Sequence, residues 1–133
     1  MLVDDHKIVR ESWKMLLENN PKFEIIADFN NGEEALEHIQ KLAPDIMLVD
    51  INMSPMNGLQ LTEKVIQLMP DVRILGLSVN NLPKYATRIL ELGGWGYLTK
   101  TSSLEEITHG ILEVHNGRQY ICEEVRKRMN PPQ

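Results

Sequence analysis

Four apolar stretches of the sequence each end on side chains that could take part in chemistry. The first ends on two acids, the second on one acid, the third on a hydroxyl and the fourth on an amine: Asp4 and Asp5, Asp50, Ser78 and Lys100. Three carboxylates that converge repel one another unless a cation joins them. Oxygen ligands of this kind suit an octahedral Mg²⁺. If these ends meet, the residue types predict a magnesium site with an amine and a hydroxyl beside it.

The carboxylate at the centre of such a site is a candidate nucleophile toward phosphorus. A magnesium ion would screen the negative charge of the incoming phosphoryl group. Lys100 and Ser78 would bind the remaining phosphoryl oxygens. Asp50 would then carry the phosphoryl group after its attack on a donor. The expected chemistry is therefore phosphoryl transfer to Asp50.

The stretch that would position Asp50 has the clearest pattern in the chain. Residues 46–49 form a continuous apolar run, which is typical of a strand buried on both faces of a parallel sheet. Pro55, Asn57 and Gly58 mark a loop, and helical spacing resumes after them. Asp50 is therefore predicted at the carboxyl end of a central strand, where ligands collect in open α/β sheets.

The rest of the chain alternates strands with helices. Five strands alternating with five helices predict an α/β fold with a doubly wound parallel sheet. A flavodoxin-like strand order of 2-1-3-4-5 puts the second strand at the edge and the other four ends on one rim. The strands are predicted at 1–3, 23–29, 46–50, 72–78 and 95–100, and the helices at about 6–17, 31–42, 59–68, 83–92 and 104–114.

Length and composition fit one globular domain. The chain has 133 residues, of which 42% are hydrophobic and 25% charged. A net charge of −5 argues against direct binding of nucleic acid, and no apolar run reaches membrane-spanning length. The single cysteine, Cys122, cannot form an internal disulfide, which fits a reducing cytoplasm. The four histidines show no ligand spacing that would predict a zinc site.

The sequence predicts a tail at the C-terminal end of the chain and an unusually short strand at the N-terminal end. Residues 1–120 are expected to form the domain, and residues 121–133 a tail or the start of a linker, fraying from residue 126. The first strand is short, since residues 1–3 precede the acids and strands usually run to about five or six residues. We therefore expect a frayed lower sheet with unpaired backbone groups. A late start of the sequence would explain the short strand, or a segment of a partner chain would fill the gap beside it.

The motifs at the strand ends resemble those of a known family. They resemble those of a two-component response regulator receiver domain over nearly the whole chain. The residues of these motifs are most similar to the subfamily with a LuxR/NarL-type helix-turn-helix output domain. In this sequence Ser54 separates Met53 from Pro55, where the family has Pro after Met, and Thr101 replaces Pro after the lysine. The matching pieces are Val3–His6, Asp50–Met53 with Asn57 and Gly58, Leu77–Ser78, and Gly96–Lys100.

The resemblance implies a role for each residue at the rim. Asp50 would accept phosphate from a sensor histidine kinase or a phosphotransfer protein, in a signalling domain that assists its own Mg²⁺-dependent phosphorylation and dephosphorylation. Asp5, Asp50 and the backbone carbonyl of Asn52 would bind Mg²⁺, with Asp4 contributing through water. Ser78 and Lys100 would contact the phosphoryl group.

The resemblance also implies how the signal leaves the site. Ser78 and Tyr97 would form the switch, with the ring of Tyr97 turning inward, and the expected result is a homodimer on phosphorylation. Asn52 and Asn80 would set the lifetime of the phosphoryl group. The output would be transcription regulation by a DNA-binding domain that is not in this chain. Trp95 is equally well interpreted as a structural contact or as part of a partner surface.

Simpler interpretations compete for the same residues. Taken alone, paired acids cap helices, and a lysine or serine at a loop is often an ordinary surface residue. A phosphatase with an aspartyl-phosphate nucleophile generally has an acid two residues after it, where this chain has Asn52. A flavin-binding module needs a Ser/Thr/Gly-rich phosphate loop after the first strand, whereas Asp4 and Asp5 would repel a phosphate.

Overall fold

Strands and helices alternate in the computed structural model, which describes residues 1–129. The strands are β1 (Leu2–Val3), β2 (Asp28–Phe29), β3 (Ile46–Asp50), β4 (Arg73–Ser78), β5 (Gly96–Thr99) and β6 (Tyr120–Ile121). The helices are α1 (Lys7–Glu18), α2 (Gly32–Leu42), α3 (Gly58–Leu68), α4 (Pro83–Glu91), α5 (Leu104–His115) and α6 (Glu123–Met129).

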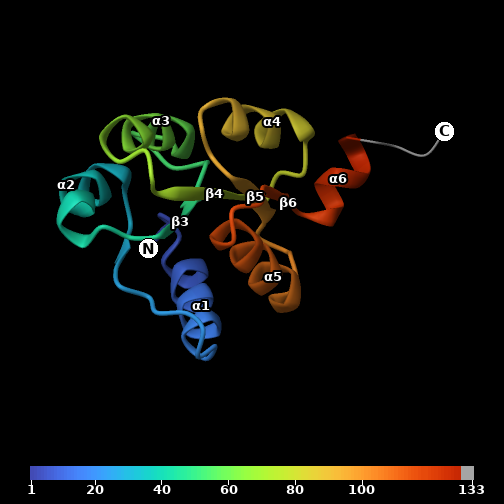
Figure 1. Ribbon diagram of the computed structural model, residues 1–133, viewed down its shortest axis with the longest axis horizontal. Helices are drawn as coiled ribbons and strands as arrows, with labels where there is room; N and C mark the ends of the chain where they lie inside the picture. The colour runs from blue at the N-terminus through green and yellow to red at the C-terminus, as the bar shows by residue number, and fades with distance from the viewer. Residues whose placement is uncertain (130–133) are drawn as a thin grey trace.

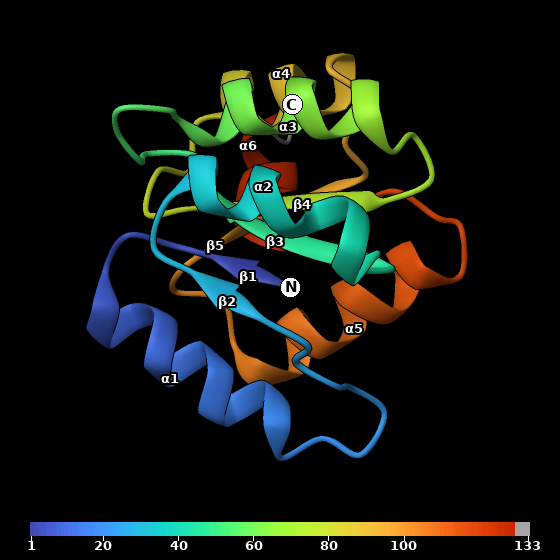
Figure 2. The ribbon, with the colours of Figure 1, turned by 90° about the vertical axis from the view of Figure 1, so that its left-hand side faces the viewer.

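All the strands lie in one parallel sheet, in the order β2-β1-β3-β4-β5-β6. Helices α1 and α5 cover one face, and α2, α3 and α4 cover the other (Figure 1; Figure 2). The predicted order is confirmed for the first five strands. Because the strands are parallel, their carboxyl ends lie along one rim. No helix of residues 1–129 is long and apolar enough to cross a bilayer.

The central strands are buried on both faces, as their continuous apolar pattern predicts. Leu48 belongs to an apolar cluster with side chains of α1 and α5, whereas Met47 and Val49 pack in a second cluster with α2 and α3. Burying one such side chain contributes about 1.5–3 kcal/mol. The packed centre of the sheet therefore fixes the position of Asp50, the last residue of β3.

Three helices begin at polar caps. The side chain of Asn31 accepts a hydrogen bond from the Glu34 N–H at 2.8 Å, and Ser103 caps α5 in the same way. Asn57 and Gln60 form a reciprocal capping box at the start of α3. The third cap fixes where the chain leaves the loop after Asp50.

The predicted count of five strands is wrong by one short strand. The strand β6 pairs with Gly96 and Tyr97 of β5. Gly117, at φ +86°, lies in the turn that follows α5 and precedes this strand. Two residues are too few to show the alternation of a strand in the sequence, so the sequence pattern did not predict β6.

The expected fraying is absent from residues 126–129, and the start of a linker in residues 121–129 stays a prediction. Ile121 belongs to β6, and Glu123–Met129 form α6. Cys122 and Val125 are fully buried in the apolar cluster that contains Leu48. The folded unit therefore extends to residue 129, and residues 130–133 of the predicted tail lie outside the described residues.

The strand predicted over residues 23–29 is present at Asp28 and Phe29. Its partner explains the difference, because β1 pairs through Leu2 and Val3, and the Leu2 N–H donates to the Ala27 carbonyl at 3.2 Å, so that residues 23–26 have no β1 residue beside them. A parallel strand needs a neighbour along its length to form ladder hydrogen bonds. The apolar side chains of residues 23–26 line a cavity instead.

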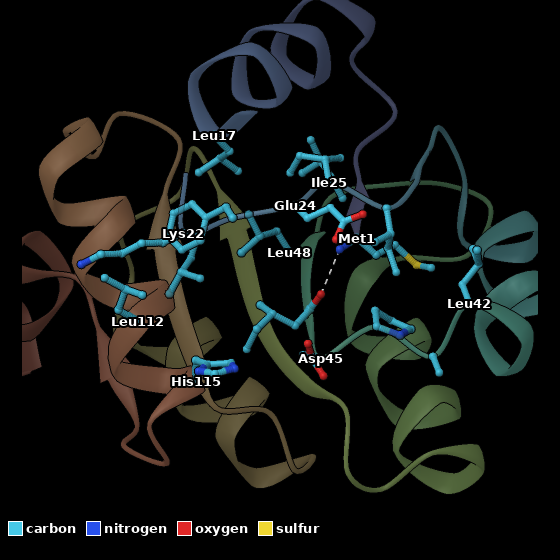
Figure 3. A pocket seen from close by; sticks show the side chains of 17 residues that line it. Met1, Leu17, Lys22, Glu24, Ile25, Leu42, Asp45, Leu48, Leu112 and His115 are labelled. Carbon is cyan, nitrogen blue, oxygen red and sulfur yellow. Dashed lines mark hydrogen bonds between the residues drawn. The ribbon is translucent and has the colours of Figure 1, made fainter. Parts of the chain in front are cut away.

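That cavity lies beside Met1, at the amino end of the sheet (Figure 3). Its volume is about 650 Å³. The Met1 amino group donates to the Ile46 carbonyl at 2.9 Å, and the Met1 carbonyl accepts from the Leu48 N–H at 2.9 Å. These bonds supply partners to backbone groups that were expected to lack them. The short first strand is therefore accompanied by a cavity, and not by unpaired backbone groups at Met1. The apolar lining includes Leu2, Leu17, Phe23, Ile25, Leu48, Ile111 and Leu112.

Candidate functional site

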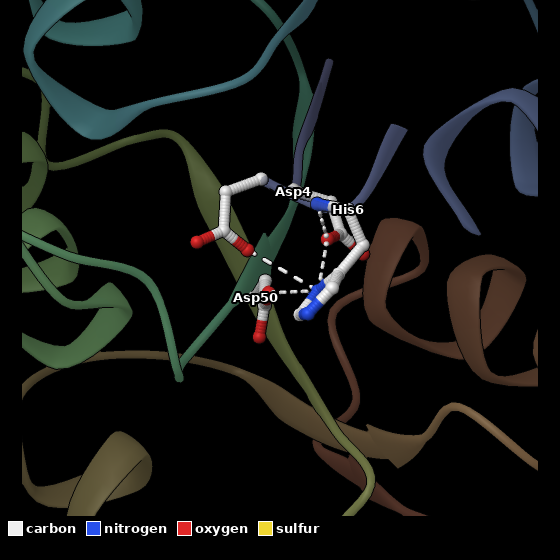
Figure 4. A group of neighbouring side chains, drawn as sticks. Asp4, His6 and Asp50 are labelled. Carbon is white, nitrogen blue, oxygen red and sulfur yellow. Dashed lines mark hydrogen bonds and ion pairs between the residues drawn. The ribbon is translucent and has the colours of Figure 1, made fainter. Parts of the chain in front are cut away.

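Three carboxylates from two strand ends meet at the carboxyl rim. Asp4 and Asp5 follow β1, and Asp50 ends β3. Asp4 is 1% exposed and Asp50 is fully buried, whereas the Asp5 side chain is 31% exposed. One ligand atom from each acid and one from the neighbouring His6 all lie within 4.8 Å of one another (Figure 4). Negative charges this close require a cation.

The ammonium group of Lys100 reaches both buried acids. Its Nζ lies 3.0 Å from Asp4 Oδ2 and 3.1 Å from Asp50 Oδ2, and its side chain is 7% exposed. Lys100 directly follows β5, and its N–H donates to the Ser78 carbonyl at 2.8 Å. The end of β5 is thereby held against the end of β4. One ammonium faces three carboxylates, so the site retains an excess of negative charge.

Two carboxylate oxygens of this site accept no hydrogen bond within residues 1–129. They are Asp4 Oδ2 and Asp50 Oδ2, both buried. Lys100 attracts both at ion-pair distance but does not meet hydrogen-bond geometry. Buried oxygens without hydrogen bonds are costly, and they are the hard ligands that Mg²⁺ prefers. The donor set fits a magnesium ion held through oxygen.

A hydroxyl and an amide complete the surroundings of Asp50. Asp50 Oδ1 accepts from the Asn52 N–H at 3.0 Å, and the Asn52 carboxamide donates to Ser78 Oγ at 2.9 Å. Ser78 Oγ also accepts from the Asn80 N–H at 2.9 Å. The Asn80 side chain turns away, because its Oδ1 accepts from the Leu82 N–H at 2.9 Å. Asn52 and Ser78 are thus brought to the site, and the Asn80 carboxamide is not.

The start of α3 passes against the backbone of Asp50. A Cβ atom on Gly58 would stand 2.3 Å from the Asp50 carbonyl oxygen and 2.6 Å from Ile51 Cα. The Gly58 N–H donates to the Ile51 carbonyl at 3.2 Å. The loop between them turns through a cis Ser54–Pro55 peptide. A residue without a side chain is therefore required at position 58 for this close approach.

The chain matches the model of the response regulator receiver domain over residues 1–112. It belongs to this family. The receiver domain is of the LuxR/NarL type, since a LuxR-family response regulator from Aurantimonas sp. SI85-9A1 has a TM-score of 0.91 at 30% identity, over 96% of this chain and 91% of that one. The receiver domain of the putative response regulator NarL from Mycobacterium tuberculosis has a TM-score of 0.82 at 30% identity, over 88% and 94%.

Curated relatives of this receiver domain are longer proteins. The transcriptional regulatory protein DegU of Brevibacillus brevis is 39% identical over 121 residues, which cover 91% of this chain and 51% of the relative. Response regulator UvrY of Escherichia coli K12 is 30% identical over 129 residues, covering 97% and 59%. The chain spans about half to three fifths of the length of these relatives.

Tyr97 of the receiver domain is buried beneath the loop that follows β4. Its side chain is fully buried, and its hydroxyl donates to the Asn80 carbonyl at 2.5 Å. Burial raises the pKa of Tyr97 to about 12. Ser78 binds the N–H of the same residue, Asn80. The two residues of the predicted switch, Ser78 and Tyr97, therefore both bind the backbone of Asn80, one at its N–H and the other at its carbonyl.

Trp95 is engaged inside the receiver domain. It lies just before β5, half-buried against the apolar cluster that contains Tyr97. The Arg73 guanidinium stands 4.8 Å from the centre of its ring, within range of a cation–π contact. Arg73 also donates to the Val114 and His115 carbonyls at 2.9 and 2.7 Å. These contacts favour the structural interpretation of Trp95, and its role on a partner surface stays a prediction.

His6 was missed by the sequence reasoning. Its Nδ1 lies 3.3 Å from Asp4 Oδ1, 3.2 Å from Asp5 Oδ1 and 3.6 Å from Asp50 Oδ2, with the side chain 61% exposed. The His6 N–H also donates to Asp4 Oδ1 at 2.9 Å. The signal in the sequence is adjacency to the paired acids, and a search for spaced metal ligands does not detect it.

Replacing Asp5 by Asn is expected to stabilise the metal-free protein. Burial and the charge of Asp50 raise the pKa of Asp5, so its ionised form costs folding free energy. Relief of this repulsion should add about 1 kcal/mol, or about 4 °C in melting temperature. Added Mg²⁺ should stabilise the native protein and leave the variant unchanged.

Thermal melts in chelator and in Mg²⁺ measure both effects. Asp71→Asn, at an exposed loop position, is the matched control and should change neither melt. A variant that melts lower than the native protein in chelator would contradict the charge argument.

Proposed function

We propose that Asp50 is the phosphoacceptor of this receiver domain, taking its phosphoryl group from a sensor histidine kinase or a phosphotransfer protein. The supporting observation is the pair of buried, hydrogen-bond-free oxygens on Asp4 and Asp50, each about 3 Å from the Lys100 ammonium. A surface acid would be hydrated, whereas these buried oxygens face one shared ammonium, and each carboxylate oxygen can accept more than one contact. This arrangement leaves lone pairs available for a metal and for phosphorus.

Each residue of the site has one task in this proposal. Asp4, Asp5, Asp50 and the Asn52 backbone carbonyl would hold Mg²⁺, which supplies charge screening when bound. An Asp50 oxygen attacks the phosphorus of the donor, a P–O bond forms, and the donor leaves with the electron pair of the bond that breaks. Lys100 and Ser78 bind oxygens of the transferred group. The reaction needs the donor and no other substrate.

Intact mass after incubation with acetyl phosphate and Mg²⁺ tests the proposal. One phosphate-sized mass gain is expected in the native protein. No gain is expected with excess chelator or in Asp50→Asn, because that substitution removes the nucleophile. Asp71→Asn is the matched control and should be labelled normally. Labelling that survives the loss of Asp50 or of the metal would refute the assignment.

The proposed output of phosphorylation is self-association. Ser78 and Tyr97 would act as the switch, because both bind the loop at Asn80. The Tyr97 ring already lies inward without a phosphoryl group, so the proposed change is in the bond of its hydroxyl to Asn80, a two-state element that a phosphoryl group would bias. Sedimentation of the two forms should show dimers on phosphorylation and none in Tyr97→Ala. Equal association in all forms would remove this output and leave the phosphoryl chemistry in place.

Three further parts of the proposal follow from the family. Asn52 and Asn80 would influence the phosphoryl lifetime, and Asn52 is the one whose carboxamide adjoins the site. We place the protein in the cytoplasm, where a kinase could reach it. Control of transcription would be exerted by an attached DNA-binding domain, since a receiver domain with a net charge of −5 is poorly suited to bind DNA itself.

A further inference from the structure

The segment Tyr120–Met129, which comprises β6 and α6, covers part of the predicted switch. The Cys122 N–H donates to the Tyr97 carbonyl at 2.9 Å, beside the β5–β6 pairing. Cys122 and Val125 are fully buried in the cluster that contains Tyr97. The helix α6 lies next to α4 (Figure 1). The C-terminal segment is therefore packed on the elements that would respond to phosphorylation.

Glu124 connects this segment to two of those elements. Its Oε1 accepts from the Asn81 side chain at 2.9 Å, and its Oε2 accepts from Thr99 Oγ1 at 3.1 Å. Asn81 lies in the loop after β4, and Thr99 immediately precedes Lys100. Thr99 is 1% exposed, so its bond to Glu124 is partly shielded from water. One carboxylate thus joins α6 to both strand ends that carry the predicted phosphoryl ligands.

A short chain of contacts leads from the phosphoryl site to Glu124. Ser78 Oγ accepts from the Asn80 N–H, and Tyr97 donates to the Asn80 carbonyl. Asn81, the next residue, donates to Glu124. When Ser78 Oγ turns toward a phosphoryl group, its bond to Asn80 is lost. The loop then moves, and Asn81 moves with it.

The contact between α6 and the rest of the domain combines one buried apolar side chain with exposed or partly buried polar contacts, and this small apolar area favours its release. Within α6 the buried side chain is Val125. An open cavity of about 520 Å³ lies between part of the helix, the end of β5 and the start of α5. The segment is held at its start by Glu106, which accepts from the Tyr120 hydroxyl at 2.8 Å and from the Glu123 N–H at 2.7 Å. The cavity lining includes Asn81, Thr99, Thr101, Ser102, Ser103, Glu124, Lys127 and Arg128.

We propose that phosphorylation of Asp50 releases α6 from the domain, and that Glu124 is the positioning residue that couples the two events. The inference rests on the proposed function, because it requires a phosphoryl group on Asp50. Glu124 stabilises the docked position of α6 through Asn81 and Thr99, and loop movement removes the first of these bonds. Glu106 and Tyr120 keep the start of the segment in place.

Hydrogen exchange of the α6 amides, with intact mass read from the same sample, tests this coupling. In the native protein, acetyl phosphate and Mg²⁺ should accelerate exchange over residues 123–129 by about fivefold or more, since exchange follows the opened population. Glu124→Ala should exchange at the fast rate without phosphate and gain little on labelling. Glu123→Ala is the matched control, because that side chain pairs on the surface with Lys127 at 3.2 Å and should leave the native response intact.

The possible failures are distinguishable. Absence of a mass gain at Asp50 overturns the proposed function and this inference with it. A normal mass gain with unchanged exchange in α6 overturns the release and leaves the phosphoacceptor role standing. Release that occurs normally in Glu124→Ala, from a slow starting rate, overturns the role of Glu124. Equal effects of Glu123→Ala and Glu124→Ala would do the same, because they would reflect helix content alone.

Discussion

Lys100→Met is expected to destabilise the metal-free protein by about 3 kcal/mol, because removing one partner of a buried ion pair leaves charge uncompensated. Asp4 and Asp50 are 1% and 0% exposed, and the Lys100 ammonium lies 3.0 and 3.1 Å from their oxygens. Methionine keeps the length of the side chain and removes the charge. The two acids would then repel each other in a site shielded from water.

Magnesium should restore much of that stability, because the acids that bind it remain in place. Phosphorylation should no longer change the tryptophan fluorescence, since the group that would report the phosphoryl oxygens to β5 is gone. Urea melts in chelator and in Mg²⁺ measure the first effect. Fluorescence before and after labelling measures the second.

Two further variants make the Lys100 prediction decisive. Adding Asp50→Asn to Lys100→Met should recover at least half of the lost stability, because one of the unpaired charges is removed. Lys64→Met, at an exposed position of α3, should cost little. If Lys100→Met is as stable as Lys64→Met in chelator, the ammonium does not compensate the acids.

Gly58→Ala is expected to cost about 1–3 kcal/mol, the range for forcing extra volume into a packed site, and to slow phosphorylation. The added Cβ would stand 2.3 Å from the Asp50 carbonyl oxygen, so either α3 or the end of β3 must move. Backbone atoms cannot turn aside as a flexible side chain can. A displacement at Asp50 moves its carboxylate relative to Lys100 and lowers the labelling rate at fixed acetyl phosphate.

Gly32→Ala is the matched control for this substitution. Gly32 and Gly58 are each the first residue of a helix, α2 and α3. A Cβ on Gly32 meets the Met56 sulfur at 3.0 Å, which is the end of a flexible side chain. Gly32→Ala should therefore be close to neutral in stability and normal in labelling. Equal behaviour of the two alanine variants would mean that the close approach at Asp50 has no consequence.

The parts of the structure with long patterns were predictable from the sequence. The apolar run before Asp50 indicated a buried strand, and the topology of parallel strands implied that Lys100 and Ser78 would meet it. The first inference rests on the hydrophobic pattern of a short segment. The second rests on the alternation of strands and helices along the chain, which implies parallel strands. The close approach of Gly58 to the Asp50 backbone was not predictable, because it depends on how two elements pack.

The misses have physical causes of the same kind. The strand β6 is two residues long, and α6 has seven, so neither contains enough periods to be recognised. The apolar residues Tyr120, Ile121, Cys122 and Val125 hint that this part folds. Segment 23–26 has the composition of a strand but no neighbouring strand residue to pair with, which shows that strand formation depends on a neighbour as well as on residue type.

The shortness of β1 has a consequence for the affinity of the site. This strand carries Asp4 and Asp5, yet it has only two ladder residues, Leu2 and Val3, with further backbone bonds at Met1 and Asp4, and it borders a cavity of about 650 Å³. Local opening of β1, which would also release its partner β2, would remove two acids from the rim while β3 to β6 stay folded. The apparent dissociation constant for a cation is then the intrinsic constant divided by the fraction of molecules with β1 in place. Any contact that fills the cavity, at the end of the sheet away from the acids, tightens cation binding without touching a ligand.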